Sequence, residues 1–136
     1  MLRSLFPAAL ALAMVGCTVT PPRIVVSANR APKDPLDVRF VQIQFEHIDI
    51  QDAILLMATK VTKVYGSRYA LSPAFESATD PMMRQPLRKA PVSFRGRDVS
   101  ARAVFDELCR QAGWSYRWTV KHDIMFRDGP SGPRRI

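Results

Sequence analysis

The chain has 136 residues, 47% of them hydrophobic and 24% charged, and carries a formal net charge of +8. This length is enough for one globular domain and not for two. Neither a disulfide scaffold nor a zinc site follows from the two cysteines, Cys17 and Cys109, and we expect no intrachain disulfide. The charge is uneven, because residues 84–136 carry twelve Lys/Arg against five Asp/Glu. That half is expected to attract anionic partners, or to be a solvated basic surface.

A three-part leader opens the chain. Arg3 is followed by an apolar run over residues 5–15, which is too short to span a bilayer and typical of a signal peptide at residues 1–16. The segment Met14-Val15-Gly16-Cys17 resembles the lipobox of bacterial lipoproteins. This resemblance implies cleavage before Cys17 and a covalent lipid on its thiol, with no other cofactor. The alternative is an ordinary secretory peptide with an incidental cysteine. Thr18, where Asp would retain a lipoprotein at the inner membrane, favours the outer membrane.

Residues 17–37 contain four prolines and are predicted to form an extended tether. The short apolar island Ile24-Val25-Val26 is either a chance cluster or a strand that docks on a partner.

The folded domain is predicted over residues 38–128. Alternating Val41, Ile43 and Phe45 indicate a half-buried strand. A helix follows, with Asp49 as its N-cap, Asp52 reaching back to it, and Gly66 after its last residue. Its buried stripe consists of Ile50, Ile54, Met57, Ala58 and Val61. A short strand is expected over residues 68–71. Residues 72–90 are expected to be a long loop, whose Met82 and Met83 could contact a partner.

The same order recurs in the second half. A strand containing Val92 and Phe94 precedes a helix that is capped by Ser100 and ended by Gly113. Its buried stripe consists of Val104, Leu108 and Ala112. Residues 114–120 and 124–126 predict a hairpin with a turn at residues 121–123, and residues 129–136 a frayed tail.

A shift of 49 residues places Phe45 on Phe94 and Asp49 on Asp98. Two strand–helix units of this kind predict an α+β fold, with small sheets packed on two helices and a β-hairpin at the end. This pattern resembles the short N-terminal domain of secretins and TonB-dependent receptors (STN, or N0-like), which also occurs in short lipoproteins of type IV secretion outer-membrane complexes. It is carried by the segment from Phe45 to Ala53 and by its second copy from Val92 to Ser100.

We expect no enzymatic activity. His47 and His122 have no metal-binding or catalytic spacing, Asp106 and Glu107 are expected to be solvated, and Cys109 to be a partly buried, inert thiol. Nucleic-acid binding through basic strands beside Tyr116 and Trp118 is a weaker alternative, because these rings are expected in the core and export removes most nucleic acid from reach.

The resemblance therefore implies a lipid-anchored outer-membrane protein that faces the periplasm. It would dock onto secretion-channel or outer-membrane complex proteins, with a homo-oligomer as a further option. Arg95, Arg97 and Arg117 are the candidate partner-binding residues. An envelope regulator or a cell-wall-binding accessory lipoprotein is the alternative function.

Overall fold

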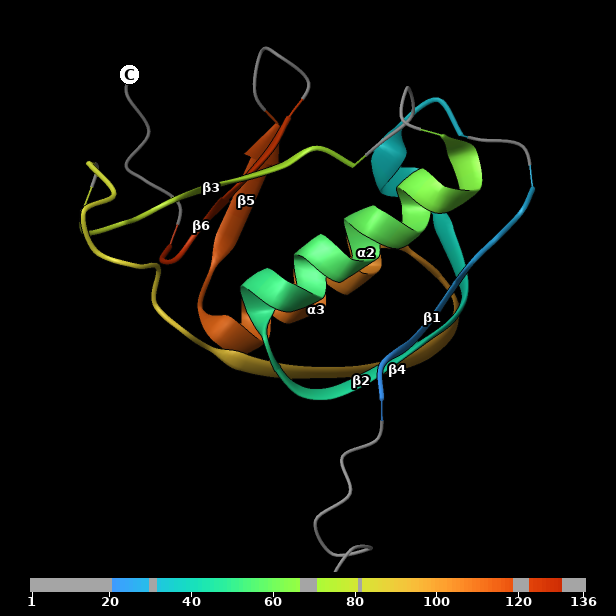
Figure 1. Cartoon of the computed structure of the whole chain (residues 1–136), viewed down its shortest axis with the longest axis horizontal. Helices are drawn as coiled ribbons and strands as arrows, with labels where there is room; N and C mark the ends of the chain where they lie inside the picture. Colours follow the sequence, from blue (N-terminus) through green and yellow to red (C-terminus); the bar gives the residue numbers. More distant parts are fainter. Residues whose placement is uncertain (1–20, 30–31, 67–70, 81, 119–122, 131–136) are drawn as a thin grey trace, which may run out of the picture.

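The computed structural model describes residues 21–29, 32–66, 71–80, 82–118 and 123–130. The predicted signal peptide, Cys17, most of the expected strand at 68–71, and residues 131–136 of the predicted tail lie outside these ranges. The described chain is an α+β fold, as the sequence predicts. Two helices lie between two small sheets (Figure 1).

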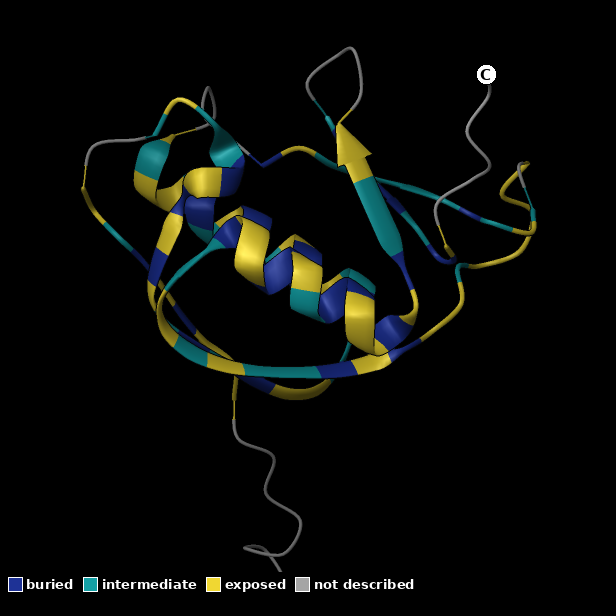
Figure 2. Ribbon diagram, turned by 180° about the vertical axis from the view of Figure 1, so that it is seen from behind, coloured by how far each residue is buried: buried dark blue, intermediate teal, exposed yellow. Residues whose placement is uncertain are grey.

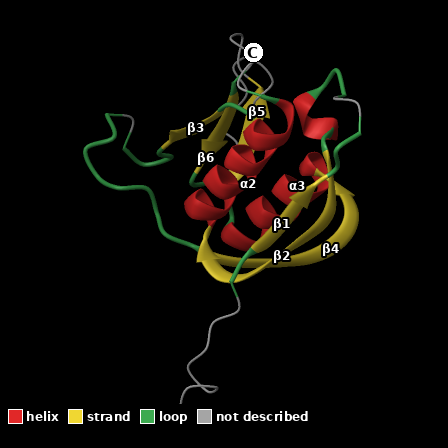
Figure 3. Cartoon of the chain, turned by 45° about the vertical axis from the view of Figure 1, so that its right-hand side comes forward, coloured by secondary structure: helices red, strands yellow, loops and turns green. Residues whose placement is uncertain are grey.

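The first sheet is antiparallel, in the order β1-β2-β4. Its strands are β1 (Arg23–Val26), β2 (Arg39–Asp49) and β4 (Pro91–Ser100). β2 has one extra residue relative to β4 between Phe45 and Ile48, where the register shifts. Such bulges bend a strand and increase its twist. In Figure 3 this sheet curves beneath the two helices.

The second sheet is mixed, in the order β3-β6-β5. β5 (Ser115–Trp118) and β6 (Ile124–Arg127) are antiparallel, which confirms the predicted hairpin strands. β3 (Pro73–Glu76) pairs in parallel with β6, so part of the expected loop at 72–90 is a strand. The loop prediction was wrong here because the partner strand lies about fifty residues further along the chain, where local periodicity gives no signal.

Both predicted helices are confirmed. α2 (Ile50–Tyr65) buries the predicted stripe, and Gly66 follows its last residue. α3 (Ala101–Ala112) begins at Ser100, whose hydroxyl accepts a hydrogen bond from the Ala103 N–H, and ends at Gly113 in the left-handed conformation. Asp49 stands at the N-cap position of α2 as predicted, but the prediction that its side chain caps the helix was wrong. The Asp49 carboxylate accepts no bond from its own helix and instead accepts one from the Ala90 N–H at 2.9 Å.

The two strand–helix units are related as the sequence echo suggests. β2 and β4 lie antiparallel, and Phe45 is the direct cross-strand partner of Phe94, 49 residues later. Their ring centroids are 6.4 Å apart. The echo therefore places two equivalent residues opposite each other on the neighbouring strands β2 and β4.

The folded unit begins before the predicted boundary at residue 38. β1 pairs with β2, and Ile24 and Val26 are each only 7% exposed. The short 3-10 helix η2 (Pro35–Asp37) buries Leu36 against the core. The interpretation of residues 17–37 as an extended tether is therefore wrong for β1 and η2. Prolines flank β1 without entering it, so they do not interrupt its pairing.

One buried carboxylate fixes the connection between β3 and β4. Asp128, directly after β6, accepts hydrogen bonds from the Ala78 N–H at 2.6 Å and the Arg88 N–H at 3.0 Å. Both donors belong to the segment expected to be a loop. The Asp128 side chain thus ties this segment to the second sheet.

Candidate docking surface on the first sheet

The structure separates the three arginines that the sequence singles out. Arg95 and Arg97 lie on β4 in the first sheet, and both are exposed. Arg117 lies on β5 in the second sheet, where its Nη1 is 3.5 Å from the Glu76 Oε1. The helices lie between the two sheets (Figure 1). The three residues therefore do not form one binding surface.

Arg95 and Arg97 instead share a face with residues from β1 and β2. The strand register aligns Arg23, Gln44 and Arg95 in one cross-strand row, and Val25, Gln42 and Arg97 in the next. The side chains between these rows, including those of Ile24, Ile43 and Phe45, are buried toward the helices. In Figure 2 buried and exposed bands alternate along these strands. We call Arg23, Gln42, Gln44, Arg95 and Arg97 the basic face.

The basic face carries unneutralised positive charge. Within the described ranges, Arg23, Arg95 and Arg97 form no ion pair. The Asp98 carboxylate is bound to the Arg39 guanidinium, with Nε and Oδ1 2.8 Å apart. Glu46, two residues beyond Gln44, is exposed and adds one negative charge beside the face.

The face is hollowed over β2 and β4. Two shallow depressions of about 180 and 220 Å³ lie between these strands. The Arg95 side chain lines both, with Gln44, Glu46 and Ser93 in the first and Gln42, Gln44 and Arg97 in the second. Guanidinium and amide groups around a shallow depression can donate several hydrogen bonds to one anionic group.

The outer edge of β4 is only partly closed. The Gln111 side chain of α3 makes two bonds to Ser93: its Oε1 accepts from the Ser93 N–H at 3.0 Å, and its Nε2 donates to the Ser93 carbonyl at 2.8 Å. The Ser93 backbone therefore points away from β2. Because strand backbone groups alternate with a period of two, those of Arg95 and Arg97 point the same way.

No described residue replaces Gln111 at those two positions. β4 is an edge strand of the sheet, and the backbone groups of Arg95 and Arg97 have no partner on its outer side in the described parts of the chain. We call the outer backbone of Arg95–Arg97 the open edge. An edge with free N–H and C=O groups can accept a further strand.

Sequence reasoning missed four residues of this surface, namely Arg23, Gln42, Gln44 and Gln111. Arg23 was assigned to the tether, because its place in the sheet depends on pairing with a residue about twenty positions further along the chain. Gln42 and Gln44 alternate with buried residues, so their outward direction was available from periodicity. Gln111 carried no signal, since its role depends on the position of α3 beside Ser93.

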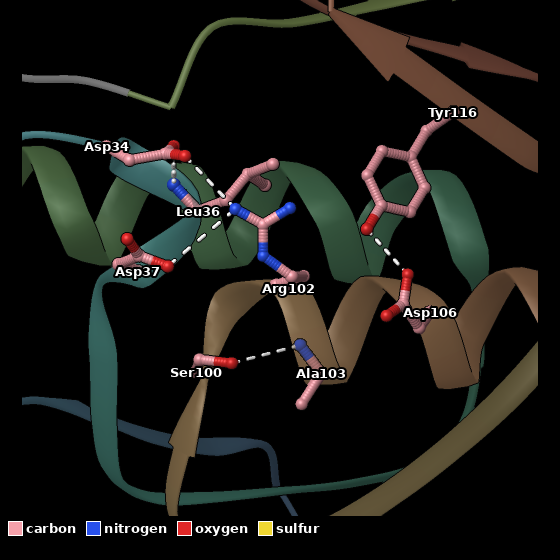
Figure 4. Close-up of polar contacts among 8 residues, drawn as sticks. All are labelled: Asp34, Leu36, Asp37, Ser100, Arg102, Ala103, Asp106 and Tyr116. Atoms are coloured by element: carbon pink, nitrogen blue, oxygen red, sulfur yellow. Dashed lines mark hydrogen bonds and ion pairs between the residues drawn. The ribbon is translucent and has the colours of Figure 1, made fainter.

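A second polar cluster lies at the first turns of α3 (Figure 4). The Arg102 Nη2 is 3.0 Å from the Asp34 Oδ2 and 3.7 Å from the Asp37 Oδ1. The Tyr116 hydroxyl donates to the Asp106 Oδ1 at 2.6 Å. These contacts join η2 and β5 to α3. Each group has its partner within the fold, so we assign the cluster a structural role.

The ionisable groups on and beside α3 also have their hydrogen-bond partners or their burial within the fold. The hydrogen bond from Arg110, aided by one from Gln111, lowers the pKa of Glu107 to about 2. Burial, with a smaller contribution from Asp106, raises the pKa of the Cys109 thiol to about 12. Burial and the bond to Asp106 also raise the pKa of Tyr116. A thiol with so high a pKa is a poor nucleophile near neutral pH.

Among the described residues, no three His, Cys, Asp or Glu side chains are grouped closely enough to hold a metal ion. His47 lies at the bulge of β2 with a positive φ of 51°, and its N–H donates to the Ser93 hydroxyl. His122 lies outside the described residues. Within the described ranges, no helix is long and apolar enough to cross a bilayer.

No protein-family model, curated protein or solved structure matches this chain.

Proposed function

We propose that this protein is a lipid-anchored outer-membrane subunit of an envelope-spanning secretion assembly. In this role it binds an extended segment of a partner protein along the open edge. The observation that carries the proposal is the free backbone of Arg95 and Arg97 next to the Ser93 backbone that Gln111 already closes. A partner strand would pair in the same plane, beginning where the Gln111 side chain ends.

The side chains at the open edge define the kind of partner. Two adjacent outward arginines disfavour pairing of β4 with β4 of a second copy, since like charges would face each other. An extended segment carrying Asp or Glu would instead form charge-assisted bonds with Arg95 or Arg97. We therefore expect an acidic, extended partner segment.

Two sequence features support the place of action. The leader and the segment ending at Cys17 resemble those of bacterial lipoproteins, and Thr18 favours the outer membrane. The two strand–helix units resemble the short domain found in secretins and in type IV secretion lipoproteins. An anchor on Cys17 would concentrate the open edge at one membrane, where weak strand pairing is sufficient.

Nucleic-acid binding receives no comparable support. Tyr116 packs on Phe126 in the second sheet, with ring centroids 5.6 Å apart. The expectation that Trp118 lies in the core was wrong, since it is 39% exposed at the end of β5. The two cross-strand rows of the basic face contain no aromatic side chain. Stacking platforms for single-stranded nucleic acid require such rings beside the basic groups.

The test is purification of the complex from native membranes with two variants of one residue. Arg95→Gln removes the charge and keeps the N–H, whereas Arg95→Pro removes the charge and also the outward N–H. We expect partner recovery to fall in a salt-dependent manner with Arg95→Gln and to disappear with Arg95→Pro. Unfolding midpoints of the two variants control for damage to the fold.

Intact-mass analysis of the same sample tests the anchor, for which we expect a lipid on Cys17. Full partner recovery with Arg95→Pro, together with normal secretion in a deletion strain, would refute docking at the open edge. That outcome would favour the regulator or cell-wall-binding function.

A further inference from the structure

We infer that the basic face lies against the headgroups of an anionic membrane. This orients the domain so that the open edge runs along the membrane surface. The placement rests on the proposed anchor at Cys17. It uses the outward Arg95 and Arg97 side chains, which would also flank a partner strand, and leaves the backbone of the open edge free to pair.

The first argument is the length of chain between the anchor and the sheet. β1 begins at Arg23, so only the five residues 18–22 separate it from Cys17. Six peptide units extend at most about 20 Å. This is less than the width of a domain of this size, which is roughly 30 Å. The first sheet is therefore held close to the surface that carries the lipid.

The second argument is which side of the molecule the short tether holds. Arg23 is itself a member of the basic face and lies in a row with Gln44 and Arg95. Figure 1 shows β1 on the side of the helices opposite the second sheet. A tether that enters at Arg23 presents the first sheet to the membrane and directs the hairpin away from it.

The third argument is charge. Arg23, Arg95 and Arg97 are exposed and free of ion pairs in the described part of the chain, against the single carboxylate of Glu46. Attraction of arginine to an anionic leaflet extends over about one Debye length, roughly 8 Å at physiological salt. Three arginines within this distance should strengthen binding on the order of a hundredfold.

Two exposed valines on the outer side of the sheet fit the same surface. Val25 lies in the row of Gln42 and Arg97, and its side chain is 44% exposed. Val41 adjoins Gln42 at the irregularity between β1 and β2 and is 53% exposed. The predicted alternation, which put Val41 on the buried side with Ile43 and Phe45, was wrong at this residue because the register shifts there. Apolar side chains among arginines are typical of surfaces that rest in the headgroup region. An acidic protein surface would also match these charges. Only the membrane also accounts for the five-residue distance between the proposed anchor at Cys17 and the basic face.

The test anchors the mature chain chemically to lipid nanodiscs. A Cys109→Ala chain beginning at Cys17 keeps both sheets and all core residues apart from that thiol, and its only thiol, on Cys17, can be coupled to a maleimide-headgroup lipid. Discs of phosphatidylcholine with or without phosphatidylglycerol also contain a gadolinium-chelate lipid. Relaxation of the backbone amides then reports how near each strand lies to the headgroups.

In anionic discs we expect amides of β1 and β4 to relax severalfold faster than those of β5 and β6. The difference should be much smaller in neutral discs, at high salt, and in the triple variant Arg23→Gln, Arg95→Gln, Arg97→Gln, where only the short tether orients the domain. The control Lys63→Gln, Arg84→Gln, Lys89→Gln removes the same charge from exposed positions outside the first sheet and should retain the difference.

Equal relaxation of both sheets in anionic discs would overturn the inference, as would a difference that is undiminished in the first triple variant. Binding of a free acidic peptide to Arg23, Arg95 and Arg97 without any effect of phosphatidylglycerol would assign the face to a protein instead. Because the maleimide lipid supplies the anchor, these results bear on the face alone. Absence of a lipid on Cys17 in cells would contradict the proposed function and leave the nanodisc result standing.

Discussion

Replacing one buried side chain of β1 tests whether this strand belongs to the folded domain. Ile24 is 7% exposed and contacts the core, whereas Val25, the next residue, is 44% exposed on the outer side. Ile24→Ala should therefore destabilise the domain, and Val25→Ala serves as a matched control on the same strand. An extended tether would predict no effect from either substitution.

The magnitude follows from burial. Truncating a buried isoleucine to alanine lowers the free energy of unfolding by about 2–5 kcal/mol. Because β1 is an edge strand of only four residues, it can shift to fill part of the cavity, so we expect a cost near the lower end of this range. We expect about 2–3 kcal/mol for Ile24→Ala and about 0.5 kcal/mol or less for Val25→Ala. Single domains are stable by about 5–15 kcal/mol, so Ile24→Ala should remain folded but clearly weakened.

Urea unfolding of the mature chain, followed by circular dichroism, measures this difference. With a denaturant slope of about 1–3 kcal/mol per M, the midpoint of Ile24→Ala should fall by about 1 M or more. A chain that begins at Asp37 should be less stable still, since it lacks β1 and the Leu36 side chain. Equal midpoints for Ile24→Ala and Val25→Ala would refute the assignment of β1 to the core.

Three further substitutions or reactions test the packing. Asp128→Ala leaves the Ala78 and Arg88 N–H groups without their acceptor and should cost about 2–3 kcal/mol in urea unfolding, with Asp128→Asn milder. Val104→Asp, which buries an unpaired charge at a fully buried position, should prevent folding as judged by circular dichroism. The Cys109 thiol should react with a disulfide reagent at pH 8 roughly a thousandfold more slowly in the folded chain than in the urea-unfolded chain, since its pKa is raised to about 12. The stability linked to this raised pKa is present below about pH 9 and is lost as pH rises toward 12, so unfolding midpoints should fall in that interval.

The parts of the fold that local sequence determines were the parts that could be predicted. α3 combines an N-cap at Ser100, a buried stripe every three or four residues and a glycine at its end, and all three signals act within one helix. The hairpin strands β5 and β6 likewise lie close together in sequence and alternate clearly.

The missed features depend on contacts between distant residues. β3 is four residues long and exists because β6 pairs with it in parallel. β1 is equally short, and the prolines around it indicate a linker until β2 is placed beside it. The Asp49 carboxylate has the right position for a helix cap, but the Ala90 N–H, 41 residues away, binds it instead.

In the candidate site, too, the residues set by local sequence could be predicted and those set by distant strand pairing could not. Arg95 and Arg97 could be identified as outward strand residues from alternation alone. Arg117 fits the same pattern but lies on the other sheet, and only the topology separates it from them. Arg23 joins the basic face through pairing of β1 with β2, which no local pattern predicts.

Site-specific photocrosslinking in native membranes tests docking at the open edge most directly. A photoreactive amino acid at position 97 projects from the sheet beside any strand added to β4, whereas the same residue at position 63 lies on the exposed side of α2 and serves as the control. We predict a crosslink from position 97, and not from position 63, to an extended acidic segment of a secretion-channel or outer-membrane complex protein. Crosslinks of equal yield from both positions, or none from position 97 in cells that secrete normally, would contradict the account.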